Sequence, residues 1–236
     1  MIQACLNGNR TTAEAPKVPL TPDALASEAR AAVHAGAACL HIHPRADEGA
    51  ETLASDHVAA ALDAVRAAVS GIPVGIGTGA WIAPGGVARH ADIRDWTVMP
   101  DYASLNVHED DAADVARLLA EKGVAIEAGV WDRSDVPRFA SRIDPAACCR
   151  ILVEIPDLPA SEALAEADAT LQGLADLETG LPILLHGSDR SAWPVLQQAL
   201  RLGLDTRIGF EDAVTMPDGA PAPDNAALVR AAMMLA

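Results

Sequence analysis

The sequence predicts an α/β protein built as a (β/α)8 TIM barrel, and three observations support this prediction. Short apolar runs bounded by glycine, proline or polar residues alternate with alanine- and leucine-rich amphipathic segments along the chain. No linker or low-complexity tract divides the 236 residues. Eight strand–helix units fit one closed parallel barrel. Residues 1–236 are therefore expected to form a single barrel domain, with short rim loops because a typical barrel needs about 250 residues.

Each expected element follows from a local pattern. The expected strands are apolar runs at 2–6, 38–43, 73–76, 102–106, 124–129, 149–154, 182–186 and 206–210. The expected helices cover 22–35, 55–69, 85–95, 110–122, 136–142, 160–178, 191–202 and 225–235, and the pattern at 85–95 is the weakest. Thr21 and Pro22 are typical of a helix start, and Gly36, Gly123 and Gly203 are typical of helix ends.

A doubly wound open sheet is the alternative architecture. It is less favoured because no GxGxxG motif follows the first strand and eight units exceed what such sheets usually need. In a barrel, functional residues gather where the strands end. The residues expected at that rim are Asn7, Gly8, His41, His43, Thr78, Ser104, Asn106, His108, Glu127, Glu154, His186, Glu211 and Asp212.

The charge balance excludes several partner classes. Lys and Arg number 17 and Asp and Glu number 33, which gives a formal net charge of −16. No cluster of basic residues is present, so nucleic acid and acidic membranes are not expected as partners. No apolar stretch is long enough to cross a membrane, and the N-terminus lacks the features of a signal peptide. A cytoplasmic location is therefore expected.

His41 and His43 form the sharpest motif. Side chains two apart on a strand point the same way, so both imidazoles are expected to enter the barrel mouth and could reach one metal ion. A catalytic zinc needs a third protein ligand, and Glu211 directly follows the eighth expected strand. Asp212 would then be a nearby base or a partner of a ligand. The alternative is that both histidines are hydrogen-bonded core residues.

Several segments together resemble the β-keto acid cleavage enzyme family along nearly the whole chain. The most specific are His41-Ile42-His43-Pro44-Arg45 and the closing Arg207-Ile208-Gly209-Phe210-Glu211-Asp212. The other matching segments are Asn7-Gly8-Asn9-Arg10, Leu20-Thr21-Pro22-Asp23, Ala35-Gly36-Ala37, Gly77-Thr78-Gly79, Ala103-Ser104-Leu105-Asn106, Glu127 and Gly187-Ser188-Asp189-Arg190.

The resemblance implies a zinc enzyme in which a β-keto acid and acetyl-CoA give acetoacetate and a new acyl-CoA. It implies that His41, His43 and Glu211 bind Zn²⁺ and that Arg207 and Asp212 form the catalytic pair. The residues implied for substrate binding are Arg10, Gly77, Thr78, Gly79, Ser104, Asn106 and Glu127. The residues implied for the phosphates of CoA are Gly187, Ser188 and Arg190, at a helix N-terminus. Homo-oligomers are also implied, in keeping with the apolar segment 231–235.

Some positions depart from the family pattern or allow a structural role. Arg10 stands where the family's type member has a glutamate that meets an amine, so an acidic or neutral substrate group is expected here. The roles of His108 and His186 stay open. Several residues of the expected site also have a structural alternative. Arg207 could form an ion pair that only stiffens the barrel, and Glu127 could be a barrel carboxylate whose hydrogen bonds are all made within the protein. The hydroxyls of Thr78 and Ser104 could cap local backbone, and 187–190 could be an ordinary turn.

The sequence also allows two other functions. The same metal site could serve a C–C lyase or hydrolase that does not use CoA. The chain could also be a non-catalytic descendant that binds a metabolite. The second is disfavoured because a binding protein does not need an open zinc position beside an arginine–aspartate pair.

Overall fold

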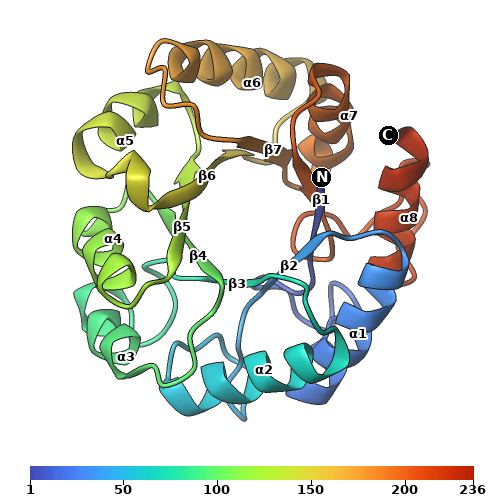
Figure 1. Ribbon diagram of the computed structural model, residues 1–236. Coiled ribbons are helices and arrows are strands. Elements are labelled where there is room, and N and C mark those ends of the chain that lie inside the picture. The colour runs from blue at the N-terminus through green and yellow to red at the C-terminus, as the bar shows by residue number, and fades with distance from the viewer.

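Eight parallel strands form a ring at the centre of the protein, with helices around it (Figure 1). The computed structural model describes residues 1–236. The strands are β1 Ile2–Cys5, β2 Cys39–Ile42, β3 Val74–Gly77, β4 Tyr102–Asn106, β5 Ala125–Val130, β6 Cys148–Ile155, β7 Ile183–Gly187 and β8 Thr206–Ile208. Their order is β7-β6-β5-β4-β3-β2-β1-β8, so each strand pairs with its neighbours in sequence and β1 pairs with β8.

The contact between β7 and β8 closes the ring. Leu184 and Asp205 form a parallel bridge, and the amide of Leu185 donates to the carbonyl of Asp205 at 2.9 Å. A doubly wound sheet would have a reversal in its strand order, and none is present. The predicted TIM barrel is confirmed and the open-sheet alternative is wrong.

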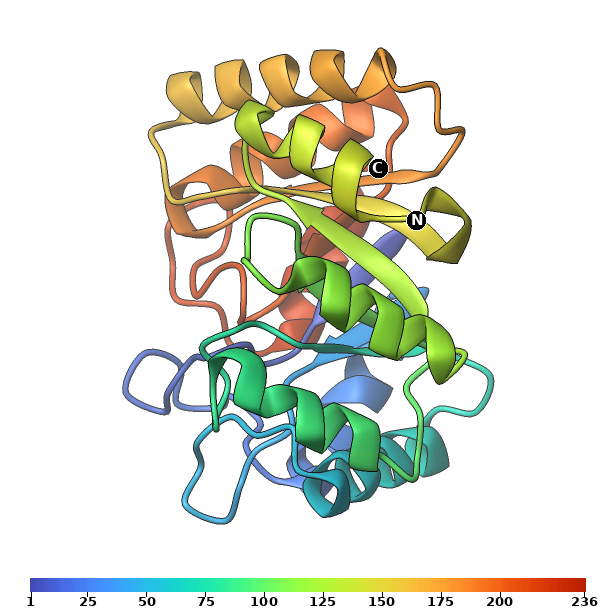
Figure 2. The same cartoon turned by 90° about the vertical axis from the view of Figure 1, so that its left-hand side faces the viewer.

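The helices lie outside the ring, as Figure 2 shows for α3 to α6. Their bounds are α1 Pro22–His34, α2 Ser55–Ala68, α3 Arg89–Asp95, α4 Ala112–Glu121, α5 Val136–Arg142, α6 Ala160–Ala175, α7 Ala192–Leu202 and α8 Asn225–Leu235. Short 3-10 turns occur at Gly86–Ala88, Arg133–Asp135, Pro145–Ala147 and Asp189–Ser191. None of the helices has the length and apolar character that crossing a membrane requires.

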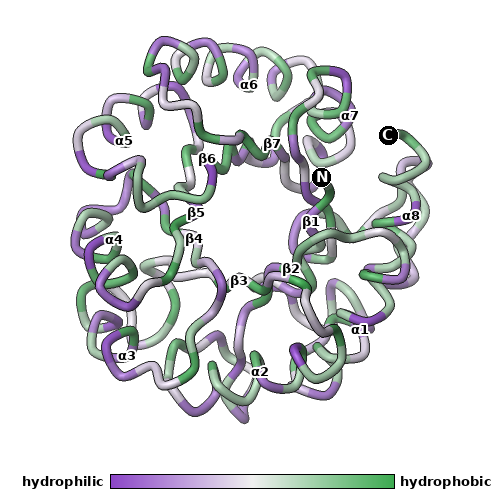
Figure 3. The backbone as a smooth tube through the Cα atoms, viewed as in Figure 1, coloured by the Kyte–Doolittle hydropathy of each residue, from purple (hydrophilic) through white to green (hydrophobic).

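The helix α1 illustrates how the sequence forms the outer layer. The Thr21 side chain accepts a hydrogen bond from the amide of Ala24 at 3.2 Å, as its predicted role as N-cap requires. Leu25, Ala29 and Ala32 follow helical spacing and are buried against the barrel. Hydrophobic and hydrophilic segments alternate along the outer helices in Figure 3, as expected for helices with one buried face.

Two elements differ from the sequence prediction in a way that matters locally. The helix α6 ends at Ala175 rather than at 178, and the chain then takes a left-handed turn at Glu178 with φ 48°. The strand β8 ends at Ile208 rather than at 210. A side chain at Gly209 would collide with the carbonyl of Cys5, so the backbone passes very close to β1 there. The amides of Asp212 and Ala213 both donate to the Gly209 carbonyl, which turns the chain at the rim.

A polar layer fills the barrel below the rim. The amide group of Gln3 donates to the hydroxyl of Tyr102 at 2.8 Å and to Glu127 at 3.0 Å. The guanidinium of Arg150 lies 3.0 Å from Glu127 and 5.0 Å from the centre of the Tyr102 ring. This layer separates the amino-terminal end of the barrel from the rim. It holds Glu127 as a fully buried, ion-paired carboxylate.

Candidate active site

A cavity of about 350 Å³ opens at the carboxyl ends of the strands, within the size range of small-molecule sites. Eleven residues to which the sequence assigned a catalytic, binding or metal-ligating role line it: Arg10, His41, His43, Gly77, Gly79, Ser104, Asn106, Ser188, Arg207, Glu211 and Asp212. Trp81, Trp131, Leu152 and Glu154 add to its walls. The barrel thus brings together residues that lie up to about 200 positions apart in the sequence.

His41, His43 and Glu211 form a compact group of possible metal ligands. One ligand atom from each residue lies within 4.8 Å of the others. The Nε2 atoms of the two histidines are 3.0 Å apart, and they lie 3.9 and 3.6 Å from the Glu211 carboxylate. Bond lengths of about 2.0–2.1 Å in a tetrahedral zinc site place ligand atoms roughly 3.3 Å apart. The observed separations are close to that value.

Two glycines make room for these ligands. A Cβ atom at Gly77 would lie 2.6 Å from Cε1 of His43. A Cβ atom at Gly8 would lie 2.8 Å from Cβ of Glu211, and Gly8 also has the left-handed φ of 53°. Only glycine fits at these two positions without moving a ligand.

Glu51, which no sequence pattern singled out, is hydrogen-bonded to the outer nitrogen of His43. Its Oε1 atom is hydrogen-bonded to Nδ1 of His43, and its Oε2 accepts from the indole N–H of Trp81 at 3.1 Å. A backbone bridge between Arg45 and Glu51 folds the loop back over the rim. A hydrogen bond to Nδ1 leaves Nε2 of His43 free to bind a metal. No fixed spacing marks such a partner, so only the folded loop reveals it.

The charges in this group depend on burial and on neighbouring carboxylates. Burial lowers the pKa of His41 to about 3, with the charges of His43 and Arg207 acting in the same direction. Burial also disfavours charge on His43, but Glu211 and Glu51 outweigh it and raise its pKa to about 9. The pKa of Glu211 is well below its ordinary value, since Arg207 and both histidines outweigh its burial.

The residues present fit a zinc ion. Two imidazole nitrogens and one carboxylate are a donor set of catalytic zinc sites, which leave one position open. Oε2 of Glu211 is buried without a hydrogen-bond partner. A buried carboxylate oxygen without a donor is costly, and a cation between the three side chains would relieve that cost.

Arg207 ties Glu211 to Asp212. Its Nη2 atom donates to Glu211 at 2.9 Å and to Oδ1 of Asp212 at 2.8 Å, and its Nε donates to the same Oδ1 at 3.1 Å. Both Arg207 and Asp212 are almost fully buried. Oδ2 of Asp212 is buried and has no hydrogen-bond partner. This oxygen is therefore free to accept a proton from a bound molecule.

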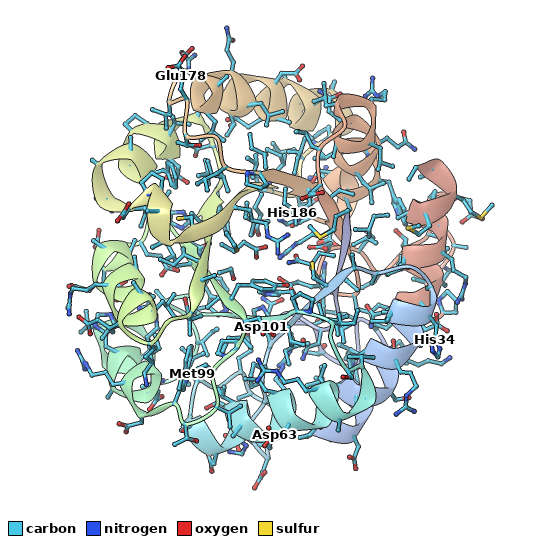
Figure 4. All side chains as sticks on the ribbon, in the orientation of Figure 1. His34, Asp63, Met99, Asp101, Glu178 and His186 are labelled. Carbon is cyan, nitrogen blue, oxygen red and sulfur yellow. The ribbon has the colours of Figure 1, made fainter.

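His186 on β7 points into the ring of strands (Figure 4), and its contacts place it beside this pair. Its Nδ1 is 3.2 Å from Nε of Arg207 and 3.4 Å from Asp212, and its Nε2 is 3.7 Å from Glu154. His186, whose role the sequence left open, thus lies between the arginine–aspartate pair and Glu154 of β6. His108 lies outside the cavity, 3.5 Å from Asp135 and edge-on to Trp131.

The two remaining arginines of the expected site differ in placement. Arg10 lines the cavity, but it donates to Glu14 at 3.3 Å and to Asp189 at 2.6 Å, so two carboxylates offset its charge. Arg190 lies outside the cavity, is exposed and pairs with Asp157 at 2.8 Å.

Three further residues of the expected site do not line the cavity. Glu127 lies in the layer below it. The Thr78 hydroxyl donates to the Ser104 carbonyl at 2.7 Å, which is the local capping role. Gly187 packs against Ser191, where a Cβ atom would be 2.5 Å from its hydroxyl. Ser104 and Asn106 do line the cavity, and Asn106 accepts from the Trp131 indole at 3.0 Å.

Comparison with known proteins gives a consistent result. A model of the family described as beta-keto acid cleavage enzyme matches residues 1–236. The 3-keto-5-aminohexanoate cleavage enzyme of Acetoanaerobium sticklandii is 25% identical over 254 residues, which cover 100% of this chain and 91% of that protein. The 3-oxoadipate:acetyl-CoA acetyltransferase of Cupriavidus necator is 30% identical over 233 residues, which cover 91% of this chain and 80% of that protein.

Solved structures share the barrel at low sequence identity. The apo structure of ObcA has a TM-score of 0.69 and 18% identity, and the match covers 93% of this chain and 61% of ObcA. This chain thus spans about three fifths of the length of ObcA. The 3-dehydroquinate dehydratase of Aquifex aeolicus has a TM-score of 0.59 and 10% identity, covering 100% of this chain and 96% of that protein. At these identities the similarity concerns the fold alone.

Proposed function

Because the chain belongs to the β-keto acid cleavage enzyme family, we propose that it transfers the carboxymethyl unit of a β-keto acid to the acetyl group of acetyl-CoA. The bond between C2 and C3 of the β-keto acid breaks, and a bond forms between C2 and the acetyl carbonyl carbon. The CoA sulfur moves from the acetyl group to the remaining acyl group. The products are acetoacetate and a new acyl-CoA, so atoms and charges balance without a redox partner.

The placement of a possible metal site beside the Arg207–Asp212 pair, in one cavity, is the observation that carries this proposal. His41, His43 and Glu211 would hold Zn²⁺. Bound zinc would act as a Lewis acid that polarises the keto oxygen. A polarised ketone makes the protons at C2 more acidic, which is what the first step requires.

Asp212 is the proposed proton acceptor. Its free Oδ2 takes the proton from C2 of the β-keto acid, while Oδ1 stays bound to Arg207. The planar guanidinium of Arg207 donates to both Asp212 and Glu211, and it therefore holds the two carboxylates in a fixed relative position. The same proton returns to a product carbon at the end of the reaction.

Ser104 and the backbone of Gly77 and Gly79 are proposed to bind the substrate carboxylate. All three line the cavity: Gly77 ends β3 next to His43, Gly79 lies in the loop after β3, and Ser104 is on β4. Arg10 and Asn106 would contact other parts of the substrate. Thr78 would contribute by holding the Ser104 backbone rather than by direct contact. Glu127 would not contact the substrate. It would stabilise the polar layer beneath the cavity, where it accepts a hydrogen bond from Gln3.

The long CoA molecule must extend beyond a cavity of about 350 Å³. Ser188 at the rim and the exposed Arg190, together with the loop at Gly187, are proposed to meet its phosphates outside the cavity. Arg190 would have to exchange Asp157 for a phosphate.

One observation favours a second candidate, a metal-dependent C–C lyase or hydrolase without CoA. Both arginines of the cavity are paired with carboxylates, so the cavity itself offers no unpaired cation to an anionic cofactor. A metabolite-binding protein without catalysis is disfavoured by the free Oδ2 of Asp212 beside the metal site.

One assay separates these functions. The protein is incubated with a panel of β-keto acids with and without acetyl-CoA, and acetoacetate and acyl-CoA are quantified. Formation of both products only with acetyl-CoA supports acyl exchange. Cleavage that is independent of acetyl-CoA supports the lyase or hydrolase. Elemental analysis of wild type and His41→Ala tests the metal site, and an unchanged zinc content would contradict it.

A further inference from the structure

The peptide bond between Thr78 and Gly79 has a carbonyl that the protein holds and an N–H that it does not. The Nε atom of Arg89 donates to the Thr78 carbonyl at 2.8 Å. None of the hydrogen bonds within the protein uses the amide of Gly79, although Gly79 is buried and lines the cavity. Buried backbone amides are nearly always paired, so this N–H is free to donate to a bound molecule.

The geometry of this peptide determines where its N–H points. The bond is trans, so its C=O and its N–H point in opposite directions. The carbonyl points at the guanidinium of Arg89, which is fully buried and does not line the cavity. The N–H of Gly79 therefore points away from Arg89, to the side on which Gly79 borders the cavity.

Glu109 holds the next amide of the same segment. Its Oε1 atom accepts from the amide of Ala80 at 2.8 Å, and its Oε2 atom accepts from Nη2 of Arg89 at 2.6 Å. Arg89 begins α3 and Glu109 precedes α4, and these helices lie side by side outside the ring (Figure 1). One ion pair thus fixes the peptide groups on both sides of Gly79.

This fixation matters because residue 79 is a glycine. A Cβ atom there would collide with the ring of Trp81, so a larger residue does not fit. A glycine has a wide choice of backbone conformations, and its own sequence does not set the direction of its N–H. The contacts of Arg89 and Glu109 supply the missing constraint.

The same carboxylate also aligns Asn106 on the neighbouring strand. Oε1 of Glu109 accepts from Nδ2 of Asn106 at 2.9 Å, while Oδ1 of Asn106 accepts from the indole of Trp131 at 3.0 Å. Because one partner only accepts and the other only donates, the amide of Asn106 has a single orientation. Glu109 thus holds two parts of the cavity wall without lining the cavity itself.

We propose that Arg89 and Glu109 are positioning residues, which direct the N–H of Gly79 at the carboxylate of the β-keto acid. This inference rests on the proposed function, in which that carboxylate lies at Gly77, Gly79 and Ser104. Neither Arg89 nor Glu109 contacts the substrate. Their effect is to prepare a hydrogen-bond donor before the substrate arrives, so that little ordering of the loop remains to be done on binding.

The test compares the binding of acetoacetate with that of acetoacetamide, in which a neutral amide replaces the carboxylate. Each compound is titrated by calorimetry into the zinc-loaded protein without acetyl-CoA. Wild type should bind acetoacetate about tenfold more tightly, which is what one hydrogen bond to a charged group contributes. In Arg89→Lys this preference should fall to about threefold or less, because lysine keeps the charge but not the planar donor pattern that holds the Thr78 carbonyl.

Glu109→Gln is the second variant. Its side-chain amide keeps one acceptor for the amide of Ala80 but cannot accept from Arg89 as well, so the preference for acetoacetate should fall here too. Thermal unfolding shows whether each variant is folded, and elemental analysis shows whether it holds zinc.

Asp111→Asn is the matched control. Asp111 accepts from Nη1 and Nη2 of Arg89 at 2.7 and 3.1 Å, and it makes no hydrogen bond to the backbone of 78–80. This variant weakens the same buried ion-pair network, so it should lose stability. It should nevertheless keep the wild-type preference for acetoacetate.

The outcomes separate this inference from the proposed function. Three results overturn the inference, even where acetoacetate forms in the assay with acetyl-CoA: equal binding of both compounds to wild type, a preference that both variants retain, or an equal loss of preference in Asp111→Asn. A preference that depends on Arg89 and Glu109, in a protein that turns over no β-keto acid with acetyl-CoA, supports the positioning role and overturns the acyl-exchange reaction.

Discussion

The carboxylate of Glu51 is hydrogen-bonded to Nδ1 of His43, and the opposite nitrogen of the same ring lies 3.6 Å from Glu211. One imidazole is thus held between a loop carboxylate and a possible fellow ligand. Partners of this kind fix the tautomer and the orientation of a metal-binding histidine.

Replacing Glu51 should therefore weaken metal binding. Glu51→Gln keeps the size of the side chain but removes the charge that orients His43, so zinc affinity should fall by about ten- to hundredfold. Competition with a chelator measures this affinity. Glu48→Gln changes an exposed glutamate of the same loop and should bind zinc like the wild type. Equal affinities for Glu51→Gln and wild type would show that His43 does not depend on this contact.

A methyl group at Gly8 should disturb Glu211. Gly8→Ala costs roughly 1–2 kcal/mol in backbone strain because its φ is 53°. Its Cβ would in addition lie 2.8 Å from Cβ of Glu211. Gly86→Ala is the control, with a similar φ of 48° and no atom within 4 Å of the new Cβ. Both variants should lose stability, but only Gly8→Ala should lose zinc. The same zinc content in both would argue against the position of Glu211 as a ligand.

Asp212→Asn should separate catalysis from metal binding. The amide cannot accept the proton from C2, so kcat should fall by about a hundredfold to ten-thousandfold. Zinc content should stay close to that of the wild type, because Asp212 is not one of the three proposed ligands. A kcat within a few-fold of wild type would exclude Asp212 as the base.

Arg89 holds a buried ion-pair network beneath the rim loops. It is fully buried and donates to Glu109 at 2.6 Å and to Asp111 at 2.7 Å. Arg89→Leu leaves Glu109 buried without a cation and Asp111 with His90 alone, which should cost about 3–5 kcal/mol of the free energy of unfolding. Urea unfolding measures this loss. Arg117→Leu, which removes an exposed pair, should change the unfolding curve little.

The same network predicts how stability depends on pH. Burial acts to raise the pKa of Asp111, but hydrogen bonds from Arg89 and His90 outweigh it and hold that pKa below its ordinary value. A carboxylate with a depressed folded pKa contributes stability above its unfolded pKa of about 3.9, and that contribution is lost as the pH falls further. Asp111→Asn should thus be less stable than wild type at neutral pH. The difference should shrink below about pH 3.9, and a difference that stays constant on acidification would contradict this assignment.

The sequence predicted the fold well because each element carries its own local signal. Thr21 and Pro22 start α1 as expected, and eight apolar runs alternate with amphipathic helices, which leaves few architectures other than a barrel. The sequence predicts that the eighth strand ends at residue 210, but β8 ends at Ile208. Nothing within residues 206–210 indicates that the backbone at Gly209 must pass close to Cys5. That contact comes from the pairing of β1 with β8, whose residues are about 200 positions apart.

The candidate site shows the same division. The sequence by itself determined the barrel, the family, and the rim position of His41, His43, Arg207 and Glu211, since strand alternation and motif spacing are local properties. The tertiary structure decided which charges are available. It paired Arg10 with Glu14 and Asp189, and it placed Glu127 below the cavity. It also brought Glu51 to His43, and Glu154 to within 3.7 Å of His186. The physical reason is that a charge acts through the groups within a few ångströms of it, and in a closed barrel those groups come from distant parts of the chain.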